Sequence, residues 1–409
     1  MPKEKYVSEG EYHLTKLTLR KGVEVIDLKG LFIDIAIYES MFDQVISGDI
    51  SITDVHGVDE RTPMYGNEMI EIEFYTAGNS SNPISITGVV YKIDAKTQLS
   101  QSASGYIIRF TDEFLMKSSR LAYRYGHELE IGKMVKQIYN NTMNNSVSDK
   151  KQIDIVPTSG IEHYVGTKAH PLGIINKLAE KSVSTSGEYG YMFYQDNQKF
   201  NFKPLEYLYK QDPVTEFINR DSGVFQDVKQ HTVERFNAIQ KIELADTNNV
   251  YAERLARGAH GSRWYSIDLI SKRVIAHDYN KTSAFDKSKS LGTTPHLYND
   301  ISETTYDDLH ITEVQANVPS GLQTKCFNLM QRENLFTFRA TITTNGDSSL
   351  SVGQVAKVNL PNWDNSKQLT VKPYSGNFLI TEIKHVLNRR TYIQSIMVQK
   401  DAYDVEFVQ

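Results

Sequence analysis

"LFIDIAIYESMFDQVISGDISITDVHGV", residues 31–58, decides the fold class, because it reads as a strand, a connection and a second strand. The connection is more apolar than an ordinary surface loop, since it contains Tyr38, Met41 and Phe42. Apolar side chains gathered at an exposed site commonly mark an interface with another chain or element. These three residues are therefore candidate interface residues, with packing over the chain's own core as the alternative.

The strand pattern continues to about residue 120. "NEMIEIEFY", "ISITGVVYKIDA" and "GYIIRFTDEF" follow one another, separated by clusters of Gly, Asn, Ser and Pro. In the first of them, apolar residues at every second position alternate with Glu71 and Glu73, as in a sheet with one buried face. The pattern predicts an antiparallel barrel or sandwich. Its glutamates are expected to face solvent, because nothing nearby suggests the desolvated pocket that a catalytic carboxylate pair needs.

The periodicity changes from strand to helix near residue 123. "HELEIGKMVKQIYNNTM" and "HPLGIINKLAEKSVS" each carry an apolar stripe at helical spacing, and Pro171 suits the first turn of the second helix. "YGYMFYQDNQKFNFKPLEYL" then reads as a hairpin with its turn at "QDNQ". Residues 123–210 are therefore expected to form a compact α+β unit. The stripe residues are Leu129, Ile131, Met134, Val135, Ile138 and Tyr139, then Leu172, Ile175, Leu178 and Ala179.

The last part of the chain returns to strands. "NAIQKIELA" and "WYSIDLI" are mixed with polar stretches that predict exposed loops, and "SGLQTKCFNLMQRENLF" has mixed helical character. Four strand patterns follow: "LFTFRATITT", "GQVAKVNLP", "NFLITEIKHVLN" and "RTYIQSIMVQKDAY". The chain is therefore expected to be mainly β with an α+β insertion. It would divide into a first β-barrel in residues 1–122, the insertion at 123–210, and a second barrel in 211–409 with a loop-rich insertion around 246–330.

The turn glycines suggest an internal duplication. Gly66 and Gly88 are 22 residues apart, and Gly353 and Gly376 are 23 apart in the corresponding late strands. This alignment shifts the buried positions by one, however, because it sets Ile70, Ile72 and Phe74 opposite Lys357, Asn359 and Pro361. A β-bulge could absorb the shift. The spacing predicts two related antiparallel barrels, and the alternative is that two unrelated sheets share their turn spacing.

Composition excludes several classes of protein. A chain of 409 residues with 40% hydrophobic residues can bury a large core, and a net charge of −5 argues against a surface made for binding nucleic acid tightly. Cys326 is the one cysteine, so an intrachain disulfide or a four-cysteine zinc site is impossible, and a small apolar role is expected for it. The N-terminal stretch lacks the apolar core of a signal peptide, and no apolar run approaches a membrane span.

Signatures of catalysis or metal binding are absent from the sequence. No HExxH, GxSxG, Walker A, dinucleotide-binding or EF-hand pattern occurs. Arg257, His260 and Arg263 could form an anion-binding turn, although a solvated loop is the simpler interpretation. His56 and His385 stand alone in strand contexts and are expected to be structural. No catalytic residue, metal or cofactor is therefore predicted.

The strand and helix blocks together resemble a known family. "YESMFDQVISGDISITDVHGV" followed by "YGNEMIEIEF" resembles the N-terminal tube domain of the baseplate central hub proteins of T-even-type, contractile-tailed bacteriophages. The stretch from "HPLGIINKLAEK" to "FNFKPLEYL" is similar to the inserted α+β domain of that family. "GNFLITEIKHVLNRRTYIQSIMVQKDAY" is similar to its last barrel strands. The likeness spans most of the chain, but residues 246–320 carry it weakly, through "RGAHGSRWYSIDLISKR".

The resemblance implies a structural role in the virion. A hub of this family is a homotrimer that caps the hexameric tail tube and carries a trimeric central spike. It surrounds an axial channel for the tape measure protein and then DNA, which passes without specific binding. Two barrels per chain would give six similar units and so match the sixfold tube. The chain ends soon after its last strand, so the spike is expected to be a separate protein. Assembly in the host cytoplasm, without membrane insertion, is implied.

Two alternatives remain at the level of the sequence. A tail-tip hub of a non-contractile phage uses a similar fold, and the residues do not separate it from a baseplate hub. A tail-associated cell-wall hydrolase is the alternative from another class. It would need an acid and base pair or a metal cluster, neither of which the sequence reveals.

Overall fold

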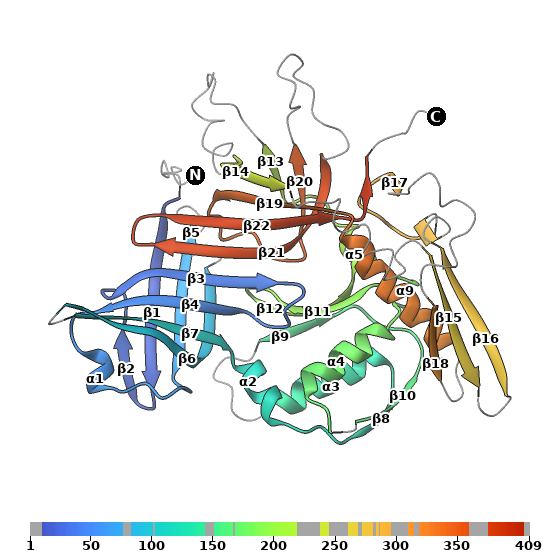
Figure 1. The fold of residues 1–409 in the computed structure, drawn as a ribbon, viewed down its shortest axis with the longest axis horizontal. Coiled ribbons are helices and arrows are strands. Elements are labelled where there is room, and N and C mark those ends of the chain that lie inside the picture. Colours follow the sequence, from blue (N-terminus) through green and yellow to red (C-terminus); the bar gives the residue numbers. More distant parts are fainter. Residues whose placement is uncertain are drawn as a thin grey trace, which may run out of the picture.

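The computed structural model describes most of the chain. The described residues are 10–76, 83–100, 103–143, 151–166, 168–218, 238–244, 261–268, 272–280, 284–285, 287–295, 310–314, 319–359 and 375–404. The chain is mainly β, with a large antiparallel sheet, a helical lower part and a smaller strand group at the right-hand side of Figure 1. The predicted fold class is confirmed to that extent.

The first part of the chain forms seven strands and two short helices. They are β1 (Tyr12–Lys21), β2 (Glu24–Asp27), β3 (Phe32–Ser40), β4 (Ser47–Asp54), α1 (Val58–Arg61), β5 (Met69–Thr76), β6 (Ile84–Ser100), β7 (Ala103–Asp112) and α2 (Glu113–Arg120). The alternation predicted for β5 is confirmed, because Ile70, Ile72 and Phe74 are buried. Glu71 lies on the other face, where Arg20 binds it at 2.9 Å and Lys16 also pairs with it.

Strand β1 was not predicted from the charged N-terminal stretch. Leu17 and Leu19 are fully buried, while Lys16 and Arg20, on either side of them in the sequence, reach Glu71 on β5. The segment is therefore half-buried like the other strands. Its outward basic side chains mask the period-two pattern, because the acidic partners that pair with them come from another strand.

The predicted α+β stretch contains helices packed on a small sheet. Its elements are β8 (Gly126–Leu129), α3 (Ile131–Met143), β9 (Gln152–Ile155), β10 (Glu162–Val165), α4 (Pro171–Glu180), β11 (Tyr191–Gln195), β12 (Lys199–Pro204) and α5 (Leu205–Leu208). Pro171 occupies the first turn of α4 as expected. Leu129 lies in β8 rather than in α3, because it pairs across to Glu162. The other predicted stripe residues are buried against the hairpin β11–β12, which provides Phe193, Phe200 and Phe202.

The remaining elements return to the large sheet after an excursion. They are β13 (Thr215–Ile218), β14 (Lys241–Leu244), β15 (Gly261–Asp268), β16 (Arg273–Asn280), β17 (Thr294–Pro295), β18 (His310–Val314), α9 (Pro319–Leu335), β19 (Phe338–Asn345), β20 (Val355–Asn359), β21 (Gly376–Asn388), β22 (Tyr392–Lys400) and β23 (Ala402–Tyr403). The helical character predicted around Cys326 is confirmed by α9. Cys326 is buried there with Trp264, Tyr279, Ala284 and Met330.

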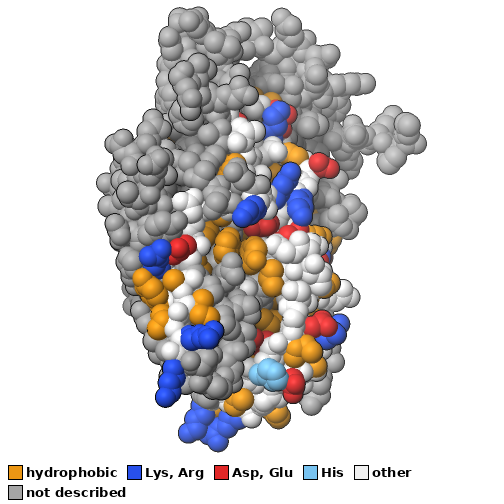
Figure 2. Space-filling model, turned by 90° about the vertical axis from the view of Figure 1, so that its right-hand side faces the viewer, with side chains coloured by type: hydrophobic (Ala, Val, Ile, Leu, Met, Phe, Trp, Pro, Cys, Tyr) orange, Lys and Arg blue, Asp and Glu red, His pale blue; other side chains and the backbone are white. Residues whose placement is uncertain are grey.

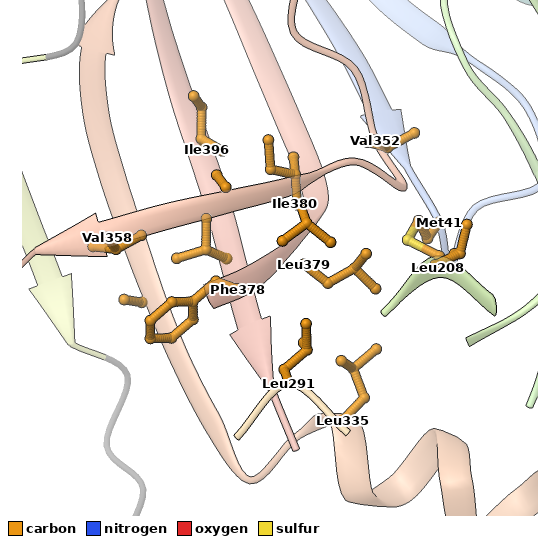
Figure 3. Packing of buried hydrophobic residues seen from close by; sticks show 14 of the residues in the cluster. Met41, Leu208, Leu291, Leu335, Val352, Val358, Phe378, Leu379, Ile380 and Ile396 are labelled. Atoms are coloured by element: carbon orange, nitrogen blue, oxygen red, sulfur yellow. The ribbon is translucent and has the colours of Figure 1, made fainter. Parts of the chain in front are cut away.

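One sheet runs through both ends of the chain. Its order is β14-β19-β22-β21-β3-β4-β7-β6-β5-β1-β2, and β20 joins it by pairing with β21 and β13. Figure 1 shows these strands stacked from β14 downwards to β7 and β6. The two separate closed barrels that the sequence predicted are not detected among the described strand pairings. Instead, β21 from the late part of the chain pairs directly with β3 from the early part. The sheet covers two apolar cores, and Figure 3 shows the one under β20, β21 and β22.

The order of pairing is the same in the early and late parts of the sheet. Strands β3-β4-β7-β6-β5 neighbour one another in that order, and so do β14-β19-β22-β21-β20. One irregularity matches as well, because the β6–β7 register shifts at Tyr91 and the β21–β22 register shifts at Thr381, although β6–β7 has two further shifts. One difference is that β13 runs parallel to β20, whereas β1 runs antiparallel to β5.

Candidate functional site

The junction of the two halves of the sheet is the pairing of β3 with β21, which we call the seam. The strands are antiparallel, from Ser40 opposite Glu382 to Asp34 opposite Asn388. The backbone bond from Met41 N to Thr381 O, at 2.9 Å, extends the pairing by one step. The seam joins segments that are nearly a chain length apart, so it fixes how the early and late strands lie together.

A buried polar network crosses the seam. Glu39 on β3 and His385 on β21 are 1% and 0% exposed, and His385 Nε2 lies 3.1 Å from Glu39 Oε1. Tyr392 OH lies 2.7 Å from His385 Nδ1. Burial raises the pKa of Tyr392 well above its usual value, with the Asp347 and Glu39 carboxylates as further causes. Its hydroxyl therefore keeps its proton and can donate to Nδ1, which leaves Nε2–H to donate to Glu39.

Two more side chains complete this network. Gln394 Nε2 donates to Tyr392 OH at 2.8 Å, and Ser351 Oγ donates to the second Glu39 oxygen at 3.1 Å. A buried carboxyl group is costly unless hydrogen bonds compensate it, and Glu39 accepts one from His385 and one from Ser351. The prediction that His385 is a structural histidine agrees with this geometry. The network links β3, β21, β22 and the turn that precedes β20.

The three predicted interface residues lie at the end of β3 but in different environments. Met41 is 1% exposed and belongs to the core under the late strands, where Figure 3 shows it beside Leu208 of α5. Phe42 is 36% exposed and stacks on Phe336 with ring centroids 5.3 Å apart. Tyr38 is half-buried, with Lys384 Nζ 5.5 Å from its ring centroid. Met41 thus packs within the chain, and Tyr38 and Phe42 remain candidates for contact with a partner.

The face of the sheet opposite the cores mixes polar and apolar side chains, and its positive and negative charges are balanced. On β4 and β19, half-exposed Ser, Thr and charged residues alternate with mostly buried apolar ones, whereas β22 presents Ile393, Ser395 and Met397 on this face. Arg109 Nε binds Asp94 at 2.6 Å and lies 3.9 Å from Asp49. The charged residues on this face and its β6 border are Asp34, Asp49, Asp94 and Glu382 against Lys92, Arg109, Arg339 and Lys384. The face is therefore close to neutral.

Among the described residues, no group of three or more His, Cys, Asp or Glu side chains could hold a metal ion. None of the described helices is long and apolar enough to span a bilayer. His56 is exposed in the turn after β4, where its backbone N–H binds Asp54. Arg257 and His260 lie outside the described residues. Arg263 is on β15, where Asp278 of β16 binds it through two hydrogen bonds of 2.6 and 3.0 Å.

The side of the molecule that carries β15 and β16 lacks a field of one sign in its described part. Figure 2 shows Lys and Arg beside Asp and Glu there, separated by apolar side chains. A basic stripe would be expected on a face that grips a phosphate backbone. The described part of this face carries no such stripe.

One buried carboxyl pair was not anticipated from the sequence. Glu188 and Glu206 are each 5% exposed; Lys210 pairs with Glu188, and Gln331 Nε2 donates to Glu206 at 3.1 Å. Burial raises the pKa of the Glu206 carboxyl to about 8, with the Glu188 carboxylate as the second cause. Two carboxyls with different protonation can serve as acid and base in an open cleft. Here both are buried and hydrogen-bonded within the chain, so the pair suits a structural role.

A pocket of about 360 Å³ lies between the β11–β12 hairpin and the turn before β20. Its lining is polar and includes Asp196, Lys199, Asn201 and Gln354. Lys199 is already bound to Asp154 at 2.8 Å. Ser351 also lines the pocket, but its hydroxyl is bound to the buried Glu39 of the seam network.

Comparison with known proteins agrees with the resemblance seen in the sequence. The chain is 22% identical over 389 residues to the probable baseplate hub protein gp334 of Vibrio phage KVP40, covering 90% of this chain and 89% of that protein. The fold of the chain is similar to that of a tail protein from Neisseria meningitidis MC58, with a TM-score of 0.59 and 11% identity. This match covers 95% of this chain and 97% of that protein. The fold is also similar to that of the prophage MuSo2 43-kDa tail protein from Shewanella oneidensis, with a TM-score of 0.59 and 11% identity. This match covers 96% of this chain and 100% of that protein. No family model matches the chain. The predicted resemblance is confirmed.

The buried seam network gives a first prediction. Replacing His385 with Ala removes the imidazole that donates a hydrogen bond to the buried Glu39 and leaves a cavity, so the free energy of unfolding is expected to fall by about 2–4 kcal/mol. The control Lys384→Ala, one residue earlier and on the exposed face, is expected to cost less than about 1 kcal/mol. Urea titration followed by tryptophan fluorescence measures both. Equal effects of the two substitutions would contradict a stabilising role for the network.

The raised pKa of Glu206 gives a second prediction. The folded state keeps a proton that the unfolded chain releases above a pH near 4.5, so the contribution of this group is complete below that pH and is lost as pH rises to about 8. Between pH 5 and pH 8, the free energy of unfolding of the wild type should fall by roughly 1–4 kcal/mol relative to that of Glu206→Gln. Melting temperatures at four pH values measure this. The control Glu128→Gln, at an exposed site, should change its melting temperature with pH in parallel with the wild type. If the melting temperature of Glu206→Gln also followed the wild type in parallel, the prediction would be refuted.

Proposed function

We propose, from its homology to a phage baseplate hub protein, that this chain is a structural hub of a bacteriophage tail baseplate. In this proposal three copies form an adaptor between the hexameric tail tube and a trimeric central spike. The similarity to gp334 covers nine-tenths of the chain, and the fold resembles that of two tail proteins over nearly their whole length. The hub would be part of the virion, assembled in the host cytoplasm.

The observation that carries the trimer proposal is the repeated strand order within the sheet. A trimer can match a hexameric ring only if each chain presents two similar units. The runs β3-β4-β7-β6-β5 and β14-β19-β22-β21-β20 are two such units. We propose that each unit corresponds to one of the barrels expected from the sequence. Three chains would then place six of them around one axis.

The face of the sheet opposite the cores is suited to line the proposed channel. A basic lumen would hold a DNA backbone through phosphate contacts and oppose its passage. The face from β19 to β7 instead carries Ser and Thr side chains with balanced charges, among them the Arg109–Asp94 pair. DNA and the tape measure protein would therefore pass without specific binding.

The division of the chain follows from this arrangement. Residues 1–122 would form the first unit of the ring and residues 211–409 the second, with a loop-rich insertion around 246–330. The α+β insertion, 123–210, would lie outside the tube wall, because its helices and hairpin close their own core, away from the face of the sheet proposed to line the channel. Tyr38 and Phe42 lie at the end of β3, where the tube proteins or the spike would be within reach. No cofactor is required for this role.

Stoichiometry provides the third prediction. The hub isolated together with its spike is expected to contain three copies of the 46.6-kDa chain. Native mass spectrometry of the complex, co-expressed from neighbouring genes, counts the copies directly. The spike is included because trimer formation of the hub can depend on it. Two, four or six copies of the hub would refute the adaptor proposal.

The absence of enzymatic activity is the fourth prediction. Purified protein is expected to produce no clear zone on a peptidoglycan zymogram, because Glu188 and Glu206 are buried and internally bonded. Neither added Zn²⁺ or Mg²⁺ nor a chelator should change this result, and lysozyme is the positive control. A zone that a single Asp or Glu substitution abolishes would establish the hydrolase alternative.

A further inference from the structure

The pocket between the β11–β12 hairpin and the turn before β20 has no part in the hub proposal. Its volume of about 360 Å³ falls within the range of about 300–1,000 Å³ that is usual for small-molecule sites. Helix α5 contributes Tyr207 and Leu208 to its wall. All of the lining residues lie within the described stretches 168–218 and 319–359. The chemistry of these side chains therefore indicates which kind of ligand the pocket fits.

The walls of the pocket are anchored to the core under the late strands. Leu208 and Val352 both line the pocket, and both belong to that core, as Figure 3 shows. Tyr194 is 2% exposed and packs against Gly353, where an added Cβ would overlap the Tyr194 hydroxyl. Buried side chains thus hold these walls in place in the folded chain, so a ligand does not have to create the pocket.

The charges at the pocket cancel. Its charged lining residues are Asp196, Lys199 and Lys203. Both lysines bind Asp154 of the neighbouring strand β9, each at 2.8 Å. The Asp196 carboxylate accepts from two backbone N–H groups of its own turn, at 2.8 and 2.7 Å, and from Asn201 Nδ2 at 2.7 Å. Two lysines are therefore balanced by two aspartates, which suits a neutral ligand better than a phosphate or carboxylate.

Three amide side chains of the lining are held in defined orientations by bonds within the chain. Gln211 Nε2 donates to backbone carbonyls of α5 and of Gly353, at 3.1 and 3.0 Å. Since Asn201 Nδ2 also donates within the chain, both of these amides present their oxygens as acceptors. Gln354 has the opposite orientation, because its Oε1 accepts from Ser351 N at 3.0 Å. Its NH₂ group is therefore the donor of the set.

Hydroxyl groups and an aromatic ring complete the lining. Ser349 is exposed at the pocket, and Tyr207 is 43% exposed, so its ring offers a flat apolar surface beside the polar groups. Burial raises the pKa of Tyr194, with the Asp196 and Asp154 carboxylates as further causes, so its hydroxyl keeps its proton. The pocket thus combines fixed donors, fixed acceptors and one exposed aromatic face.

We propose that this pocket binds a neutral saccharide. A sugar hydroxyl both donates and accepts, so it can donate to the amide oxygens of Asn201 and Gln211 and accept from the NH₂ group of Gln354. The C–H face of a sugar ring is apolar and stacks on Tyr207. A charged sugar fits less well, because both lysines of the lining are bound to Asp154. The inference rests on the lining alone and does not depend on the proposed hub function.

Saturation-transfer NMR on the full chain tests the ligand class. Chitotriose, maltotriose and lactose are the neutral probes, and trigalacturonate is the anionic probe. Chitotriose carries acetamido groups, as a cell-wall glycan does, whereas maltotriose and lactose represent hexose polysaccharides, so these probes also distinguish the two sources. At least one neutral probe is expected to receive saturation, and titration then gives its Kd. Trigalacturonate is expected to bind at least about tenfold more weakly, because its carboxylates would be desolvated without a cationic partner.

Substitutions in the lining test the place of binding. Gln354→Glu keeps the oxygen that Ser351 N–H uses but removes the NH₂ donor, so the Kd of the bound probe should rise about tenfold. Tyr207→Ala removes the aromatic face and should have a similar effect, whereas Tyr207→Phe keeps the ring and should bind within about twofold of the wild type. The matched control is Tyr125→Ala, at a tyrosine that is 62% exposed outside the pocket, and it should leave the Kd unchanged.

Melting temperatures show whether each variant is folded. The proposal would be overturned by the absence of saturation transfer to all three neutral probes, or by tighter binding of trigalacturonate. It would also be overturned if folded Gln354→Glu and Tyr207→Ala both kept the wild-type Kd. None of these results bears on the hub, which the copy number of the complex with its spike tests separately.

Discussion

The pairing of β3 with β21 is the interaction on which the rest of the structure depends. Each of these strands would otherwise present a row of unpaired backbone donors and acceptors, so each satisfies the other. Because the strands come from opposite ends of the chain, this single pairing turns early and late strands into one sheet. It also brings Met41 into the late core, where it contacts residues from α5.

The polar network gives the seam a defined register. A shift of one residue would turn every side chain of β3 to the other face and would separate Glu39 from His385. A buried carboxylate without its partner is far more costly than a mismatched apolar contact. The network therefore penalises wrong registers more strongly than it adds to total stability. It is placed at the joint where two similar units could otherwise slide along each other.

The two bulges explain how similar units can join end to end. A bulge increases local twist and bends the strand that contains it, so the second part of β21 diverges from β20 and becomes available to β3. The same device occurs in β6, where the β6–β7 register shifts at Tyr91.

The sequence by itself determined the strands with one buried face, the helices α3, α4 and α9, and the absence of catalytic signatures, because these depend on local periodicity. It did not determine β1, whose basic residues are matched by Glu71 on another strand. It also misplaced the internal repeat by one residue. Asn67 and Gly353 occupy the same turn position with φ of 77° and 83°, so the glycine at 353 corresponds to an asparagine.

With that correction Ile70 and Ile72 correspond to Ala356 and Val358, and the buried positions agree. Only the tertiary structure could decide this, because two residue types tolerate a left-handed backbone and the letters alone do not show which is used. The seam was equally invisible, since the pairing of residues 34–40 with 382–388 leaves no trace in local periodicity. Long-range strand pairing is decided by which edges remain open after the local strands have paired.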